Sequence, residues 1–169
     1  MDPACQVGTV QGRGGSIMVW GVFSWQFLGS LVLVPISLNA IRYVELLGGH
    51  LYPFMLYCHP HGNGVFQQDN CTSHKSRLTT AWLDEHSSDF SVMKWPPRSS
   101  DLNTIEHFWD VLAKGVKAHH TTPATLTKLW AALVDVWQAI LVERFRKLVE
   151  SMPRRVAAVI KARGGPTRY

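Results

Sequence analysis

Two acidic residues, Asp69 and Glu106, stand where carboxylates can serve a divalent cation. Asp69 follows a short apolar strand predicted over residues 64–68, whose sequence is GVFQQ. Glu106 comes one residue after Ile105 and three before Trp109, in the first turn of a predicted helix. In an open α/β sheet, ligands bind beyond the carboxyl ends of the strands, and Asp69 occupies such an end. We therefore expect the two carboxylates to converge there.

Convergent carboxylates predict a site for a hard divalent cation. Mg²⁺ prefers carboxylate oxygens and water as ligands. Two such ions held about 3.5–4 Å apart activate an attacking oxygen and stabilise a leaving oxygen during phosphoryl transfer. That chemistry normally uses at least three acids, so the sequence leaves a third to be found.

The strands that must position these acids are short and apolar. β-Branched and aromatic residues predict strands over residues 16–25 and 31–36, paired with each other, and over residues 64–68 and 90–95. Their near-continuous apolar character indicates strands covered on both faces. Residues 1–15 hold four glycines and a proline, and this composition predicts a flexible lead-in.

Helical periodicity accounts for most of the remaining chain. It predicts a helix capped by Asn39, a helix that begins at Thr72 or Ser73, and three helices in the last third of the chain. Pro153 is expected to kink or split the last of these. Strands followed by helices in this order predict a layered α/β domain.

Composition favours a folded, soluble, intracellular protein. Hydrophobic residues make up 46% of the 169 residues and charged residues 17%, which excludes a disordered chain. Three cysteines at irregular spacing indicate a reducing compartment. The apolar runs are too short to cross a membrane, and we expect no secretory signal. The net charge of +5 permits a polyanionic partner.

Positive charge is concentrated in the C-terminal segment. Residues 144–169 contain eight Lys or Arg and one acid. A solvated helix face is one interpretation. The other is contact with DNA phosphates through Arg154, Arg155, Lys161 and Arg163. The sequence leaves both interpretations open.

Several histidines invite a metal-binding interpretation that the spacing does not favour. Cys58, His59 and His61 bring soft ligands together, but a structural zinc site needs four ligands and no second pair lies nearby. His74 is more often a loop histidine than a ligand. Ordinary loop positions are therefore the favoured interpretation for all four.

Four motifs resemble the catalytic domain of mariner-superfamily transposases. They are GGSIMVWGVFS, VFQQDN around Asp69, WPPRSSDLNTIEHFWD around Glu106, and the closing LVESMPRRVAAVIKARGGPTRY. The resemblance runs from about residue 14 to the C-terminus. It implies a ribonuclease-H-like mixed sheet flanked by helices, incomplete at its N-terminus, with a basic helical extension from about residue 141.

The resemblance also implies a function. It implies a DDE-type endonuclease and strand transferase that acts on DNA in cut-and-paste transposition, in the nucleus, with Mg²⁺ or Mn²⁺ as cofactor. Asp69 would be the second catalytic acid and Glu106 the third, both of them metal ligands. Asn70, His74 and Asn103 would lie near the site. The implied partners are DNA, as transposon ends or target, and further transposase subunits in a homo-oligomer or with intact copies, with no membrane.

The first acid of that family lies on a central strand upstream of the GGSIMVWGVFS segment, and we expect this sequence to lack it. Asp2 falls in the glycine-rich lead-in and Glu45 on a predicted helix. Ser100 and Thr104 stand where the family usually has proline. We therefore expect weak or no catalysis by this truncated chain alone. The alternatives are a non-catalytic remnant that binds nucleic acid or transposase subunits, and a decayed product without a role.

Overall fold

The computed structural model describes residues 7–12, 15–34, 37–96, 99, 102–118 and 123–162. The strands are β1 (Val7–Gly12), β2 (Gly15–Phe23), β3 (Leu28–Val34), β4 (Gly64–Phe66) and β5 (Phe90–Val92). The helical elements are α1 (Ala40–Leu46), the π turn η1 (Leu47–Leu51), α2 (Tyr52–Cys58), α3 (Arg77–Glu85), α4 (Ile105–Ala118), α5 (Leu126–Gln138), α6 (Val142–Glu150) and α7 (Met152–Lys161). Within these ranges, no helix has the length and apolar character that a membrane span requires.

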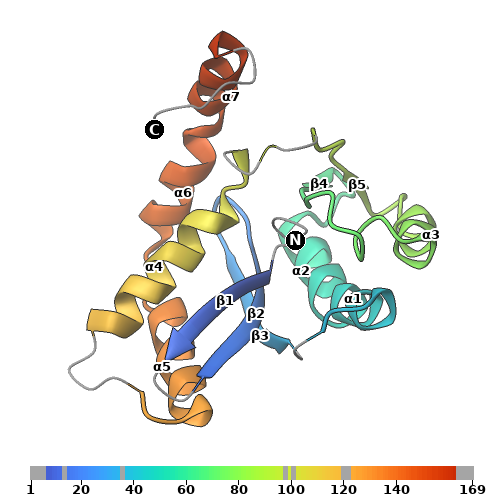
Figure 1. Cartoon of the computed structure of the whole chain (residues 1–169). Coiled ribbons are helices and arrows are strands. Elements are labelled where there is room, and N and C mark those ends of the chain that lie inside the picture. The colour runs from blue at the N-terminus through green and yellow to red at the C-terminus, as the bar shows by residue number, and fades with distance from the viewer. Residues whose placement is uncertain are drawn as a thin grey trace.

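The strands form two sheets. β1, β2 and β3 are antiparallel with β2 in the centre, and β4 and β5 form a separate parallel pair. The predicted pairing of the first two apolar runs is confirmed, since Met18 of β2 lies opposite Val34 of β3. The parallel pair lies apart from the larger sheet, near α1, α2 and α3 (Figure 1).

The prediction of a lead-in loop over residues 1–15 is wrong for Val7–Gly12, which form β1. The strand pairs with β2 along its whole length. Val10 is buried, and a Cβ atom at Gly8 would lie 2.5 Å from Cδ2 of Trp109 in α4. Tertiary packing therefore makes a strand of a segment whose glycines locally favour a loop. Residues 1–6 and 13–14 of the predicted lead-in lie outside the described residues.

Helices cover both faces of the three-stranded sheet. Successive residues of a strand point to opposite faces, and β2 follows this rule. Val19 packs in one core with Leu112 of α4 and Leu133 of α5. Trp20 packs in a second core with Tyr43 of α1. The expectation of strands covered on both faces is confirmed for β2, whereas Leu33 of β3 and Val65 of β4 are exposed. The layers are visible in Figure 1.

The helix that begins after Asn39 continues through a π turn into α2. Asn39 caps it as predicted, because its Oδ1 accepts a hydrogen bond from the backbone N–H of Arg42 at 2.9 Å. The chain then passes through η1 and continues as α2 despite the proline at position 53. Pro53 lies in the first turn of α2, directly after the π turn. The π turn already displaces the regular hydrogen bonds, so the missing proline N–H costs little there.

The last helical segment splits at Pro153, as predicted. α6 ends at Glu150, and Pro153 lies in the first turn of α7. The two helices follow one another along one side of the molecule, beside the start of α4 (Figure 1). The start of α4 carries Glu106, so this arrangement bears on the site.

Candidate active site

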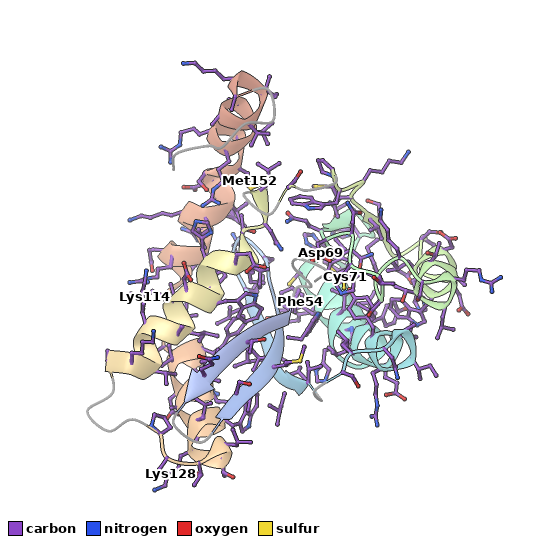
Figure 2. All side chains as sticks on the ribbon, in the orientation of Figure 1. Phe54, Asp69, Cys71, Lys114, Lys128 and Met152 are labelled. Atoms are coloured by element: carbon purple, nitrogen blue, oxygen red, sulfur yellow. The ribbon has the colours of Figure 1, made fainter. Side chains whose placement is uncertain are left out.

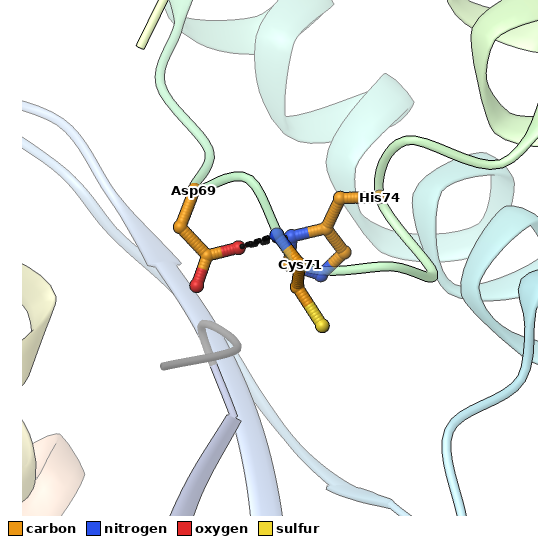
Figure 3. A group of neighbouring side chains, drawn as sticks. All are labelled: Asp69, Cys71 and His74. Carbon is orange, nitrogen blue, oxygen red and sulfur yellow. Dashed lines mark hydrogen bonds and ion pairs between the residues drawn. The ribbon is translucent and has the colours of Figure 1, made fainter. Parts of the chain in front are cut away.

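Asp69 lies three residues beyond β4, at the carboxyl end of the strand, as predicted. It is 8% exposed. Its Oδ1 accepts a hydrogen bond from the backbone N–H of Cys71 at 3.0 Å and lies 2.6 Å from Nδ1 of His74 (Figure 3). The Cys71 bond closes an Asx turn, which bends the chain away from the strand. Oδ2 is buried and has no hydrogen-bond partner among the described residues.

His74 contacts the carboxylate of Asp69 and is itself held in place by its neighbours. It is 1% exposed, and its ring stacks on Tyr43 of α1 with ring centroids 4.0 Å apart. The hydroxyl of Tyr43 donates a hydrogen bond to Oε1 of Gln68 at 2.7 Å. This imidazole is therefore fixed between α1 and the end of β4. His74 does lie in a loop near the site, as expected. Its ring, however, is buried and held in one orientation.

Asn70 joins the two strand ends. Its Nδ2 donates a hydrogen bond to the backbone carbonyl of Trp95 at 3.0 Å. Asn70 directly follows Asp69, and Trp95 lies three residues beyond β5. This bond fixes the chain after β5, which leads on towards α4.

Glu106 lies in the first turn of α4, as predicted, and is half-buried. Burial raises the pKa of its carboxyl group above the usual range, and the negative charges of Asp69 and Asp110 raise that pKa further. The two carboxyl groups therefore lie within electrostatic range of each other. Asn103 is 2% exposed, and its Nδ2 has no hydrogen-bond partner among the described residues.

The donor set fits a hard divalent cation. Two carboxyl groups from different elements repel each other electrostatically, and one oxygen of Asp69 is buried without a donor. A cation between them would relieve both the repulsion and the unsatisfied oxygen. Glu45 does not join this pair: it is exposed on α1, and its carboxylate lies 3.5 Å from Arg42.

A cleft of about 680 Å³ opens beside Asp69. Its lining includes Asp69, His74 and two exposed lysines, Lys75 and Lys94. The lysines place positive charge next to the carboxylate, as the approach of a phosphate backbone requires. A smaller cleft of about 250 Å³ lies where β2, β4 and the start of α4 meet, and Asn103 lines it.

The basic residues of α7 divide into an exposed and a buried set. Arg154 and Lys161 are exposed, as a phosphate-binding surface requires. Arg155 is 7% exposed, and its Nε donates a hydrogen bond to Oγ of Ser151 at 2.8 Å. Its Nη2 lies 3.0 Å from Nε2 of His107. Arg155 therefore packs against α4, unlike the expected phosphate contact, and Arg163 lies outside the described residues.

Several residues around the site were not predicted from the sequence. Cys71 lies two residues after Asp69, and this spacing is typical of an Asx turn, which could have signalled the bond to its N–H. Lys94 follows β5 as Asp69 follows β4, so its place at the same edge could have been inferred from the predicted strands. The contact of His107 could not be predicted from the local sequence, because its partner Arg155 lies 48 residues further along the chain.

Comparisons with known proteins find similarity to transposases. Residues 55–127, which include both acids, match the family described as DDE superfamily endonuclease. The chain is 35% identical over 168 residues to the transposable element Tcb2 transposase of Caenorhabditis briggsae, covering 99% of this chain and 60% of the relative. It is 34% identical to the transposable element Tc1 transposase of Caenorhabditis elegans, with the same coverage. The chain thus spans about 60% of the length of these curated relatives.

Solved structures show the same fold. The Mos1 transposase catalytic domain, in a structure with Raltegravir and Mg, matches with a TM-score of 0.81 and 17% identity, covering 96% of this chain and 83% of that one. A Mos1 paired-end complex with the left transposon end matches with a TM-score of 0.79, covering 94% of this chain and 47% of that one. The expected ribonuclease-H-like fold is thereby confirmed. Residues 55–127 are thus similar to DDE superfamily endonucleases, and the chain as a whole is similar in sequence to Tc1-type transposases and in fold to the Mos1 transposase catalytic domain.

Proposed function

We propose that this chain binds DNA and cleaves its phosphodiester bonds slowly, through a divalent cation held by Asp69 and Glu106. One observation carries the proposal: Oδ2 of Asp69 is buried without a hydrogen-bond partner among the described residues, at the end of β4. The charge of Asp69 also raises the pKa of Glu106 at the start of α4, which supports the pairing of the two acids. The names of the relatives, which are transposases, support the reaction class. Mos1 structures with Mg and with Mn support the choice of cation.

The described residues hold the cation site in place. When bound, Mg²⁺ or Mn²⁺ supplies Lewis-acid polarisation of a phosphoryl oxygen and lowers the pKa of a water. His74 and the Cys71 N–H engage Oδ1 of Asp69, which orients the carboxylate and leaves Oδ2 for a ligand role. Glu106 enters from a helix whose first residue, Ile105, is buried in the core. Glu106 therefore stands on a helix, and Asp69 is held by its two contacts in the turn that follows β4.

Exposed basic side chains are available to contact the phosphates of DNA. Lys75 and Lys94 line the cleft beside Asp69, and Arg154 and Lys161 are exposed on α7. Lysine and arginine contacts to phosphates position a duplex without reading its sequence. We propose transposon-end DNA in the nucleus as the substrate, and a second transposase subunit as a further partner. The Mos1 paired-end complex with a transposon end supports this choice.

The proposed rate is low because the described residues bring two carboxyl groups to the site, where such chemistry normally uses three. A misplacement of a reacting oxygen by about 1 Å costs on the order of 10²-fold in rate. The presence of two carboxyl groups in place of three also favours a second candidate function, a DNA-binding protein without catalysis. Both candidates use the same basic surface to bind DNA, but only the first cleaves the phosphodiester bond.

Nicking of supercoiled plasmid in Mn²⁺ distinguishes the candidates. We expect slow nicking that both Asp69→Asn and Glu106→Gln abolish, while Asp135→Asn, at an exposed position of α5, nicks like the unaltered chain. DNA binding with no nicking at any Mn²⁺ concentration would favour the second candidate. Nicking that persists in Asp69→Asn would show that the activity does not come from this site.

A further inference from the structure

A second set of metal-ligand atoms surrounds Asp69. A carboxylate oxygen of Asp69, the Sγ of Cys71 and a ring nitrogen of His74 all lie within 4.8 Å of one another (Figure 3). All three belong to the turn that follows β4. Glu106 lies outside this group, which is therefore distinct from the pair of carboxyl groups described above.

The chemistry of these three ligands differs from that of the carboxylate pair. Thiolate and imidazole suit Zn²⁺ and related transition metals, whereas Mg²⁺ prefers oxygen ligands alone. Zinc binds such ligands at about 2.0–2.3 Å, so neighbouring ligand atoms of one tetrahedral ion stand about 3–4 Å apart. The three atoms lie within 4.8 Å of one another, so the proposed binding requires them to move slightly closer together. Three protein ligands also leave a fourth position for water, as in an open zinc site.

We propose that Asp69, Cys71 and His74 form a site for a thiophilic cation of the Zn²⁺ class. The site shares Asp69 with the carboxylate pair, so an ion bound there removes Asp69 from the hard cation and inhibits its binding. The binding itself is independent of the proposed function, whereas the inhibition rests on it. The Cys71 thiol gives its proton to solvent when the ion binds.

The surroundings of the turn are built to hold it. His74 is stacked on Tyr43 and cannot swing freely. The hydroxyl of Ser73 donates to the carbonyl of Leu38 at 2.7 Å, and the hydroxyl of Thr79 donates to the carbonyl of Ser73 at 2.7 Å. These bonds order the turn before any ion arrives, which lowers the entropy cost of binding.

Two further observations point to a ligand. Oδ2 of Asp69 is buried without a hydrogen-bond partner among the described residues, so a ligand atom stands ready in the site. Asp69 and His74 also line the cleft of about 680 Å³, which gives an ion a route from solvent. Cys71 is half-buried, and its Sγ is the third atom of the group.

Titration of the whole chain with Co²⁺ tests the proposal, because a thiolate ligand gives a near-ultraviolet charge-transfer band. We expect the band in the unaltered chain and in a Cys5→Ser/Cys58→Ser double variant, which keeps only Cys71. We expect the band to disappear in Cys71→Ser, a variant that keeps the backbone N–H from which Asp69 accepts a hydrogen bond. His74→Gln should weaken Co²⁺ binding by about 10–100-fold. A band that survives Cys71→Ser, or no band in the unaltered chain, would overturn the proposal.

Mn²⁺ binding, read by electron paramagnetic resonance, separates this proposal from the function proposed above. Glu106→Gln should lose Mn²⁺ and keep the Co²⁺ band. Zn²⁺ also competes directly for the carboxylate pair, so it should displace Mn²⁺ from both proteins, but at a lower concentration from the unaltered chain than from Cys71→Ser. If the unaltered chain fails to bind Mn²⁺, the proposed function fails, and the Co²⁺ band still decides the thiophilic site. Displacement of Mn²⁺ by Zn²⁺ to the same extent in Cys71→Ser would refute the inhibition.

Discussion

Nη2 of Arg155 in α7 lies 3.0 Å from Nε2 of His107 in α4, so the C-terminal helix is joined to the helix that carries Glu106. The guanidinium donates and the neutral imidazole accepts, and a second bond from Nε of Arg155 reaches Ser151. The basic C-terminal segment is therefore partly structural. Its charge cannot be assigned to DNA contact as a whole.

Replacing Arg155 tests this contact. Arg155→Ala should lower the free energy of unfolding by about 2–3 kcal/mol, because a buried, charge-assisted contact is lost and His107 loses its partner. The neighbouring Arg154→Ala, at an exposed position, should change it by less than about 0.5 kcal/mol. Urea unfolding followed by circular dichroism measures both. Equal effects would show that Arg155 does not anchor α7.

The same contact predicts a dependence on pH. Burial lowers the pKa of His107 below its usual 6.5, and the charge of Arg155 lowers it further, although Asp110 acts in the opposite direction. The unfolded chain then binds more protons than the folded one, so stability is complete above pH 6.5 and falls as the pH drops towards the folded pKa. His107→Gln should remove this part of the acid sensitivity. Urea unfolding as a function of pH measures it, and identical profiles for both proteins would contradict the assignment.

The packing of β1 on α4 can be tested with a single methyl group. Gly8→Ala places a Cβ 2.5 Å from the ring of Trp109, so the strand or the indole must move. We expect a loss of about 1–3 kcal/mol in unfolding free energy. Gly49→Ala is the matched control, because a Cβ there meets nothing within 4 Å in a helical turn, and it should be neutral or stabilising. A neutral Gly8→Ala would show that β1 does not pack there.

The exposed part of the basic surface predicts a salt dependence. Arg154→Ala/Lys161→Ala should weaken DNA binding and flatten the slope of log K against log salt by roughly 2, since each phosphate contact contributes about 0.9. Lys128→Ala is the control, because Lys128 lies at the far end of the molecule from Asp69 (Figure 2). Fluorescence anisotropy with a labelled duplex measures the slope. An equal change in Lys128→Ala would indicate non-specific attraction.

Local patterns predicted much of the fold and the places of both acids. The pairing of β2 with β3 and the cap at Asn39 follow from residue type and short-range spacing. The positions of Asp69 and Glu106 follow from a strand end and a helix start. The order of strands and helices was likewise enough to predict a layered α/β domain.

What the sequence did not predict depends on contacts between distant segments. β1 is a strand because Val10 packs in the same core as α4 and α5, which no local propensity encodes. His74 is fixed by Tyr43, and Arg155 is buried by a residue 48 positions away. The side chains that orient the site are thus the ones that sequence periodicity cannot assign.

Mn²⁺ binding to the unaltered chain, Asp69→Asn, Glu106→Gln and Asp135→Asn tests most directly whether two acids share one cation. We predict that both site variants lose affinity by about tenfold or more, since each removes one of the ligands, while Asp135→Asn, at an exposed position of α5, keeps it. Glu106→Gln with the same Mn²⁺ affinity as the unaltered chain would contradict the shared site.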